Sequence, residues 1–265
     1  MNRWENILGK VSFVNCDPLY YDLQDPWEIL PAPPSWLTGH ILRKDCLIAP
    51  IPTADFAKNI DKLQLLPDIC IASKGEVGSV LLFGNTDPSM MRDIALPTDS
   101  STSRKLCMWL LKQMDLNPRA VDMGPDLGQM LDRCDGALLI GDRALDEAAR
   151  HPELIRMDLG AAWREITGYP MVFAVFAARR DAPQAQLQSA HNMLKEKLLA
   201  FENSNEIRQN VIDATAKRSG FTPERISTYF GEVINRLDED GVKGLNYFLE
   251  QVCQININDV ILTNH

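Results

Sequence analysis

Four consecutive hydroxyl residues, Ser100 to Ser103, lie where an apolar segment changes into a helical pattern. Residues 93–99 are predicted to form a short strand, and residues 104–111 begin a helix with apolar side chains on one face. A helix N-terminus carries unpaired N–H groups and the positive end of the helix dipole. Hydroxyls at this place indicate a site for a small carboxylate or phosphate, although the same residues are ordinary helix caps.

Asn15 is a second polar residue at a predicted strand end. Asp17 and Pro18 follow it, at positions that suit the N-cap and the first residue of a helix. Such a junction presents another group of backbone N–H donors to a ligand. An Asx-turn explains the same residues without a ligand, so this segment indicates a binding site only in combination with others.

Three later segments also place polar or glycine residues beside apolar runs. Residues 73–79 hold two serines and two glycines, which is typical either of a tight turn or of backbone amides close to a ligand. Asp142 follows the apolar run 136–141 and could cap a helix or orient a substrate hydroxyl. Thr167 begins the sequence Thr-Gly-Tyr-Pro, which is predicted to end a helix before an apolar strand.

Short apolar runs alternate with amphipathic stretches up to about residue 180, which predicts an α/β fold. The predicted strands are 10–15, 28–32, 46–51, 68–73, 79–83, 93–96, 137–141 and 171–177. From residue 182 the chain is predicted to be helical, with helices opened by Asp181, Thr222 and Asp240. We expect residues 1–85 and 182–265 to form one lobe and 86–181 a second, with the ligand in the cleft between them.

The composition excludes several classes of function. The chain has 265 residues and a net charge of −9, so it is not expected to attract nucleic acid or an anionic membrane. Its apolar runs are shorter than the roughly 20 residues of a membrane span, and the N-terminus lacks an apolar leader, so a cytoplasmic protein is expected. The six cysteines form no Cys-x-x-Cys pair, which is typical of reduced thiols. Without metal-ligand spacing or a nucleotide fingerprint, no metal or cofactor is expected.

Taken in this order and spacing, the segments resemble the chorismate dehydratase family of the futalosine route to menaquinone. The matching motifs are the strand that ends at Asn15, a Gly-x-Val-x-Ser-Val turn ending at Val80, the loop 100–103, the block Ile140-Gly-Asp-x-Ala-Leu and the block Trp163-x-x-x-Thr-Gly-x-Pro. Ser101 stands where many members carry arginine. The resemblance is strong over residues 10–180 and weaker beyond them.

The resemblance implies a two-lobed fold like that of type II periplasmic binding proteins, and the loss of water from chorismate to give 3-[(1-carboxyvinyl)oxy]benzoate. Asn15 is the expected catalytic residue. The expected substrate-binding residues are Ser12, Ser79, Val80, Ser100, Thr102, Ser103, Ile140, Gly141, Asp142 and Thr167. Among the hydroxyls, we expect Ser100 to cap the helix and Thr102 and Ser103 to face the ligand. None of the four histidines lies in a matching motif, and the neutral hydroxyl and amide groups favour a mechanism in which the substrate's enolpyruvyl carboxylate takes the proton.

Three other functions stay open at this point. One is a diverged member of the same family that acts on another enolpyruvyl or cyclohexadiene acid, an alternative that Ser101 keeps open. The related enzyme that forms 1,4-dihydroxy-6-naphthoate shares the fold, but we expect a histidine in its cleft. A cytosolic small-carboxylate-binding protein would close on its ligand without chemistry. In each case the expected partner is a small molecule, with no nucleic acid or membrane, and a homodimer is left open.

Overall fold

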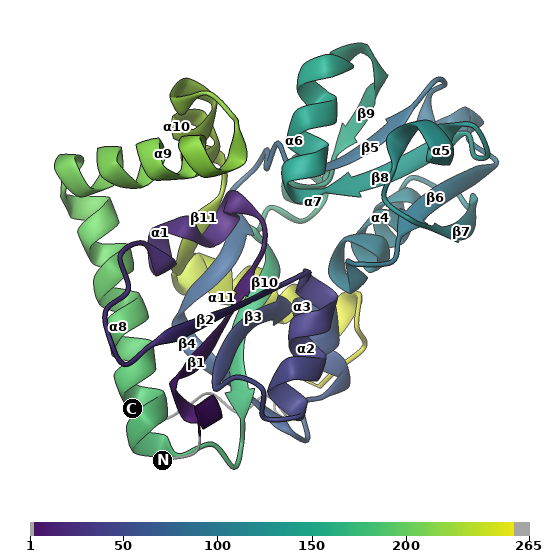
Figure 1. Ribbon diagram of the computed structural model, residues 1–265. Helices are drawn as coiled ribbons and strands as arrows, with labels where there is room; N and C mark the ends of the chain where they lie inside the picture. Colours follow the sequence, from purple (N-terminus) through teal and green to yellow (C-terminus); the bar gives the residue numbers. More distant parts are fainter. Residues whose placement is uncertain (1–2, 257–265) are drawn as a thin grey trace.

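The computed structural model describes residues 3–256, which fold into two lobes, each built on its own β-sheet (Figure 1). The first lobe has a six-stranded sheet of order β11-β4-β10-β3-β1-β2. Its strands are β1 (Ile7–Val11), β2 (Glu28–Ala32), β3 (Ile48–Pro52), β4 (Leu63–Ser73), β10 (Met171–Arg179) and β11 (Ile234–Leu237). Strand β1 is parallel to β2 and β3, whereas β10 is antiparallel to β3 and β4.

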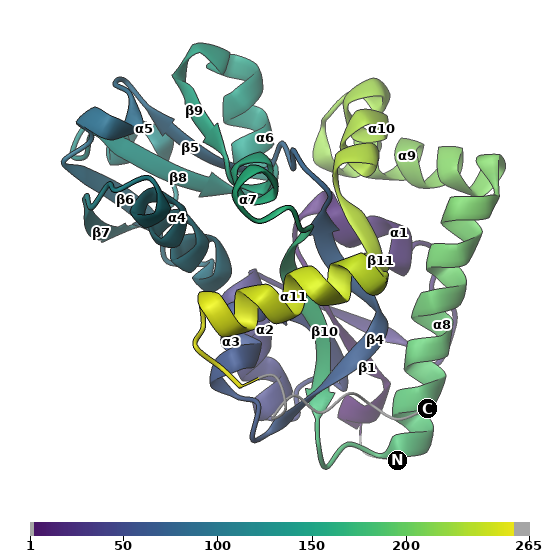
Figure 2. The same cartoon turned by 180° about the vertical axis from the view of Figure 1, so that it is seen from behind.

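The helices of the first lobe come from both ends of the chain. They are α1 (Asp17–Tyr20), α2 (Pro34–Leu42), α3 (Thr53–Lys58), α8 (Gln184–Asn203), α9 (Asn205–Ser219), α10 (Pro223–Glu232) and α11 (Glu239–Gln251). Figure 2 shows α11 crossing the back of the sheet and α8 running along its side. The C-terminal helices therefore return to the first lobe, and α9 and α10 lie at its end that faces the second lobe (Figure 1).

The second lobe has a five-stranded sheet of order β7-β6-β8-β5-β9. Its elements are β5 (Val80–Gly84), β6 (Asp93–Pro97), α4 (Ser101–Gln113), β7 (Arg119–Met123), α5 (Leu127–Leu131), β8 (Gly136–Ile140), α6 (Gly141–Arg150) and β9 (Ile155–Asp158). Strands β6 and β8 are parallel, so their carboxyl ends lie at the same edge of the sheet. Helices α4 and α6 begin at that edge, where ligands of open α/β sheets bind.

The chain crosses between the lobes twice, through residues 74–79 and through α7 (Leu159–Thr167). The carboxylate of Asp158 accepts hydrogen bonds from backbone N–H groups on both connections, including those of Gly78 at 2.8 Å and Gly160 at 2.9 Å. The crossovers therefore lie side by side and are fixed to each other. The predicted boundaries at 85 and 181 differ from this, because β5 pairs in the second sheet and β10 in the first. Both strands are continuous apolar runs, and such a run does not show which sheet it will join.

Local helix starts also differ from the predictions. Helix α8 begins at Gln184 after Pro183, and Asp181 instead pairs with Arg179. The last helix begins one residue earlier than predicted, with Asp238 as its cap. The prediction that Thr222 opens a helix is confirmed, since its side chain accepts a hydrogen bond at the start of α10.

Candidate functional site

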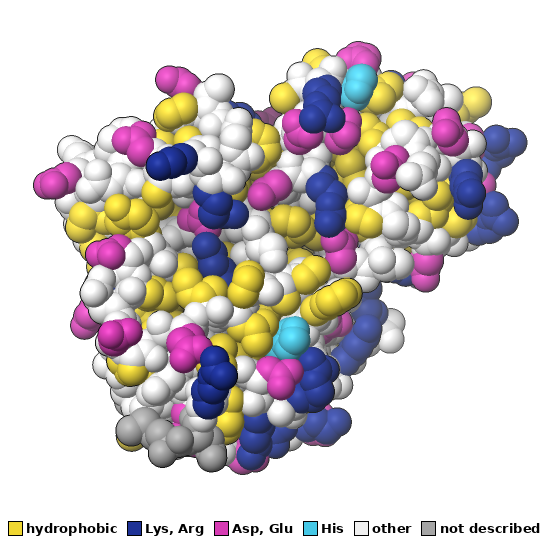
Figure 3. Space-filling view, in the orientation of Figure 1, with side chains coloured by type: hydrophobic (Ala, Val, Ile, Leu, Met, Phe, Trp, Pro, Cys, Tyr) yellow, Lys and Arg dark blue, Asp and Glu magenta, His cyan; other side chains and the backbone are white. Residues whose placement is uncertain are grey.

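A cavity lies between the two lobes, at the edge where α4 and α6 begin. The space-filling view shows the molecule hollowed between the lobes (Figure 3). The residues that line the cavity are Val11, Phe13, Asn15, Pro34, Pro52, Ile71, Val77, Ser79, Val80, Ser100, Ser103, Ile140, Gly141, Phe173, Ala174, Tyr229 and Val233. The described lining is apolar apart from hydroxyl, amide and backbone groups, and it contains no Lys, Arg, His, Asp or Glu. Such a wall suits a ligand with an apolar body and a few polar groups.

The first turn of α4 places two of the four hydroxyls in the cavity wall. Ser100 is the N-cap, and its Oγ accepts a hydrogen bond from the N–H of Ser103 at 3.3 Å, which confirms the predicted cap. Residues three apart lie on one face of a helix, so Ser100 and Ser103 face the cavity together. Thr102 is turned away. It is 1% exposed, and its Oγ1 accepts a hydrogen bond from the Ala54 N–H of the first lobe at 3.0 Å.

The Oγ of Ser101, in the same turn, is buried and has no hydrogen-bond partner within residues 3–256. Arg143 is close by but is not part of the cavity lining, and its guanidinium pairs with Asp99 at 2.7 Å and lies 5.9 Å from the centre of the Phe13 ring. An anion at this edge would therefore interact with the helix N-termini and the hydroxyls, and not with a lining side-chain charge.

The junction of β8 and α6 brings Ile140 and Gly141 to the cavity. Gly141 has φ +62°, and its N–H donates to the Ser79 carbonyl at 2.7 Å. A Cβ at this position would lie 2.5 Å from the Phe13 ring, so only glycine fits the turn. Asp142 follows but neither caps α6 nor lines the cavity, because its Oδ1 accepts a hydrogen bond from the Val14 N–H across the cleft at 3.0 Å. Burial raises the pKa of this carboxyl.

Asn15 lies on a short turn and not at the end of a strand. Strand β1 ends at Val11, and Val14–Cys16 form one turn of 3-10 helix that presents Asn15 to the cavity. Its Oδ1 is buried and has no hydrogen-bond partner among the described residues. The backbone carbonyl of Asn15 accepts a hydrogen bond from the Asn235 side chain at 3.2 Å. A buried amide without a partner is costly, so Asn15 is well placed to bind a ligand.

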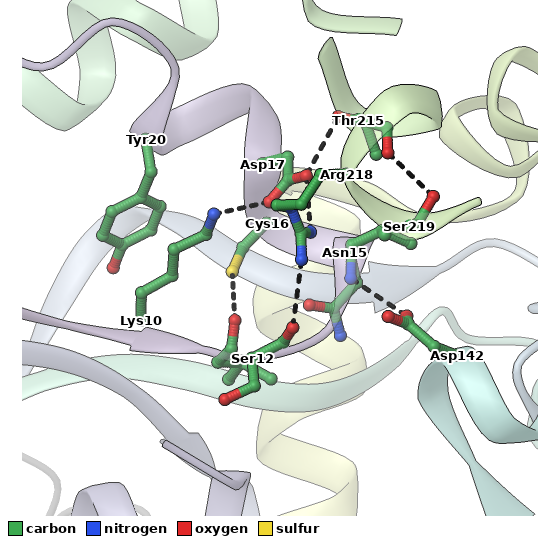
Figure 4. A network of polar contacts seen from close by, with 12 residues as sticks. Lys10, Ser12, Asn15, Cys16, Asp17, Tyr20, Asp142, Thr215, Arg218 and Ser219 are labelled. Atoms are coloured by element: carbon green, nitrogen blue, oxygen red, sulfur yellow. Dashed lines mark hydrogen bonds and ion pairs between the residues drawn. The ribbon is translucent and has the colours of Figure 1, made fainter. Parts of the chain in front are cut away.

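Asp17, predicted as a helix cap, is instead a buried carboxylate at the centre of an ion cluster beside this turn (Figure 4). Its carboxylate lies 2.6 Å from the Lys10 ammonium and 2.7 Å from the Arg218 guanidinium, and it accepts a hydrogen bond from Thr215 at 2.9 Å. A buried carboxylate needs charged partners of this kind. The cluster fixes the end of the Asn15 turn to α9.

Ser79 is hydrogen-bonded to Tyr229, which was not predicted as a site residue. The hydroxyls of Ser79 and Tyr229 share a hydrogen bond of 2.8 Å, and the two residues are 3% and 1% exposed. Burial raises the pKa of the Tyr229 phenol, so it stays protonated. Tyr229 lies on the buried face of α10 with Ile226 and Phe230, so in the sequence its spacing is that of a core residue.

The structure brings together most of the predicted site. Asn15, Ser79, Val80, Ser100, Ser103, Ile140 and Gly141 line the cavity, whereas Ser12, Thr102, Asp142 and Thr167 do not. Ser12 is exposed. The Thr167 hydroxyl donates to the Trp163 carbonyl and accepts from the Tyr169 N–H, so it closes the end of α7. Phe13 and Pro34 also line the cavity but were not predicted as site residues, and Phe173 was predicted to be a core residue. The reason is that an apolar cavity wall has the same residue types as a core.

Within residues 3–256 no group of three or more His, Cys, Asp or Glu side chains is arranged to hold a metal ion. No described helix is both long and apolar enough to cross a membrane. The described histidines are absent from the cavity wall, and His265 lies outside the described residues.

Known proteins resemble this chain in sequence and in fold. A family model described as menaquinone biosynthesis matches residues 7–254. A protein named chorismate dehydratase from Thermus thermophilus is 31% identical over 262 residues, which cover 92% of this chain and 94% of the relative.

Solved structures are similar at lower identity and therefore show the fold alone. Protein AF1704 from Archaeoglobus fulgidus has a TM-score of 0.71 at 18% identity, covering 94% of this chain and 97% of that one. The aliphatic sulphonate binding protein SsuA from Escherichia coli has a TM-score of 0.65 at 14% identity, covering 98% and 92%. The Candida albicans CA3427 product, described as having the periplasmic binding protein fold, has a TM-score of 0.69 at 12% identity, covering 98% and 97%. The predicted fold class is confirmed.

Proposed function

Because this chain belongs to the menaquinone biosynthesis family, we propose that it is a chorismate dehydratase, a lyase that converts chorismate into 3-[(1-carboxyvinyl)oxy]benzoate and water. The observation that carries the proposal is the similarity to the Thermus thermophilus chorismate dehydratase over nearly the whole of both chains. The cavity supports it, because two helix N-termini and several hydroxyls surround an otherwise apolar space.

The reaction removes a proton from the ring carbon that bears the enolpyruvyl ether. The electron pair of that C–H bond forms a ring double bond, and hydroxide leaves from the neighbouring carbon. The ring becomes aromatic, and the proton and hydroxide together account for the water. The departing proton is vinylogous to the ring carboxylate, so donors that hold this carboxylate stabilise the charge that develops in the transition state.

We assign the two substrate carboxylates to the two helix N-termini. Ser100 and Ser103 at the start of α4 form one site, and the N–H groups of the first turn of α6 beyond Gly141, whose own N–H donates to the Ser79 carbonyl, form the other. The apolar ring of the substrate then contacts side chains such as Phe13 and Phe173. This arrangement binds a dianion by oriented N–H and hydroxyl groups.

The base in this mechanism is the substrate itself. The phenol of Tyr229 keeps its proton because burial raises its pKa, and the other polar lining side chains are serine hydroxyls and the Asn15 amide. The enolpyruvyl carboxylate, which is attached beside the reacting carbon, takes the proton. Asn15 orients it, because an amide can donate to the carboxylate through Nδ2 and accept from the substrate hydroxyl through Oδ1.

The test of the function is incubation of the purified protein with chorismate, followed by chromatography and mass spectrometry. The expected result is a product lighter than chorismate by one water that coelutes with authentic 3-[(1-carboxyvinyl)oxy]benzoate. Tight binding of chorismate without this product would refute the proposal and favour a binding protein.

The role of Asn15 is tested with Asn15→Ala, and Asn203→Ala at an exposed position serves as the matched control. We expect the first variant to lose at least roughly a hundredfold in kcat, because misplacement of the reacting groups has effects of this size. The control should behave as wild type. Wild-type turnover by Asn15→Ala would remove Asn15 from the chemistry.

The proposal includes the cytoplasm as the place of the reaction, with chorismate as the partner and no protein partner required. The homodimer left open by the sequence stays a prediction. Sedimentation equilibrium of the purified protein measures the mass of the particle and decides between monomer and dimer.

A further inference from the structure

One side chain of the second lobe reaches across the cleft to the turn that carries Asn15. The Oδ1 of Asp142, in the first turn of α6, accepts a hydrogen bond from the Val14 N–H at 3.0 Å. Val14 is the first residue of the 3-10 turn Val14–Cys16. Figure 4 shows Asp142 extending from its own lobe toward this turn.

The first lobe supplies the other contacts of the same turn. The Asn15 carbonyl accepts from Asn235, and the residue after the turn, Asp17, is held by Lys10 and Arg218. These contacts lie within the first lobe and therefore do not depend on the distance between the lobes. Among the described residues, the Asp142 bond is the polar contact that reaches the turn from the second lobe.

A second hydrogen bond joins the lobes at a different place. Thr102 at the start of α4 accepts from the Ala54 N–H of α3 at 3.0 Å. This bond also requires the lobes to be closed, but it lies on another element and does not contact the Asn15 turn. The Asp142 bond holds the Asn15 turn, whereas the Thr102 bond does not. Variants of these two residues therefore distinguish the effect of lobe closure from the effect of the placement of Asn15.

We propose that Asp142 is a positioning residue, which sets the orientation of the Asn15 turn when the lobes close and so makes the site competent only in the closed state. The catalytic consequence rests on the proposed function, whereas the effect on the turn does not. An open cleft would leave the Val14 N–H without this acceptor, and the Asn15 amide would be free to vary in direction. Closure and catalysis are thus coupled through one hydrogen bond.

The charged groups around Asp142 favour this role. Burial raises the pKa of the Asp142 carboxyl, whereas Arg218 of α9 and Arg143 of α6 attract its negative charge and Asp17 repels it. The N-terminus of α6 also favours a negative charge at this position. A charged acceptor makes a stronger hydrogen bond to a backbone N–H than a neutral acceptor does.

Three variants test the proposal kinetically. Asp142→Ala removes the acceptor, and we expect kcat to fall roughly ten- to hundredfold with a smaller change in KM. Asp142→Asn keeps an oxygen that can accept, and it should recover most of the lost kcat. Thr102→Val removes a hydrogen bond between the lobes that does not reach the Asn15 turn, and its main effect should be on KM.

The matched control is Asp146→Asn, a change of the same chemistry on the outer part of α6, where Asp146 pairs only with Arg150 at 2.6 Å among the described residues. It should keep wild-type kcat and KM. Equal losses of kcat in Asp142→Ala and Thr102→Val would overturn the proposal, because closure alone would then explain both.

A direct measurement makes the test independent of chorismate turnover. In protein labelled with ¹⁵N-asparagine, the side-chain amide signal of Asn15 is identified by its absence in Asn15→Ala. We expect this signal to shift in Asp142→Ala and to stay near its wild-type position in Thr102→Val and Asp146→Asn. An unchanged Asn15 signal in Asp142→Ala would overturn the proposal, even if the protein proved inactive on chorismate.

Discussion

The hydrogen bond between Ser79 and Tyr229 supports one wall of the cavity, and its contribution to stability can be measured by a double-mutant cycle. The two hydroxyls are 2.8 Å apart, and both residues are at most 3% exposed. Tyr229→Phe and Ser79→Ala each remove one partner and leave the other hydroxyl buried without the bond. A net hydrogen bond contributes about 1 kcal/mol, and a buried group left unsatisfied costs roughly 1–3 kcal/mol.

We therefore expect each single variant to lose about 2 kcal/mol of unfolding free energy. The double variant should lose about the same amount as one single variant, because removing both partners leaves no unsatisfied group. The coupling free energy is then about 2 kcal/mol. Urea titrations followed by circular dichroism give the four unfolding free energies by linear extrapolation.

The result that refutes this reasoning is additivity, in which the double variant loses the sum of the two single losses. Additivity would mean that the hydroxyls do not depend on each other and that each finds a different partner. Tyr21→Phe serves as the control, since Tyr21 is only half-buried and its hydroxyl makes no hydrogen bond to the described residues. Its unfolding free energy should change by less than about 0.5 kcal/mol.

Three further predictions use other parts of the molecule. Gly160→Ala should lower the unfolding free energy by about 2 kcal/mol in urea titrations, because a Cβ there would lie 2.4 Å from the Gly75 carbonyl oxygen; an unchanged stability would show that the crossovers can move apart. Burial raises the pKa of the Cys16 thiol to about 12, so iodoacetamide should label this residue only after unfolding, and mass spectrometry of labelled native protein checks this. Burial also raises the pKa of Asp142 above its ordinary value of 3.8, so the folded protein binds this proton more tightly than the unfolded chain, and its contribution to stability falls as pH rises through the interval between the two pKa values. The unfolding free energy of Asp142→Asn minus that of wild type should therefore increase above about pH 4, and a difference that decreases would contradict the assigned burial effect.

The sequence predicted the elements that carry continuous apolar runs. Strand β2 has the predicted bounds, β6 ends one residue later than predicted, and β8 begins and ends one residue earlier than predicted. The strands that it missed, β7, β9 and β11, are short and partly exposed, so their residues lack a strong apolar pattern. Tertiary pairing within the sheets, and not local preference, fixes these strands.

For the candidate site, the sequence located the helix N-termini but not the direction of each side chain. Ser100 and Thr102 are only two positions apart in the chain, yet one faces the cavity and the other contacts Ala54 in the opposite lobe. The same holds for Gly141 and Asp142. The direction depends on helix phase and on how the lobes meet, and neither is encoded in a short motif. Tyr229 comes from a distant part of the chain, and only the fold brings it to Ser79.

The order of strands in the first sheet has a consequence for synthesis on the ribosome. Strand β4 lies between β10 and β11, whose residues are made long after it, whereas all strands of the second sheet fall within residues 80–158. The second lobe can therefore fold while the first still lacks the strands that flank β4. Until those strands emerge, β4 has unpaired edges, which are prone to bind other chains. A nascent chain whose first 165 or so residues have left the ribosome would be expected to present one finished lobe beside an incomplete and vulnerable sheet.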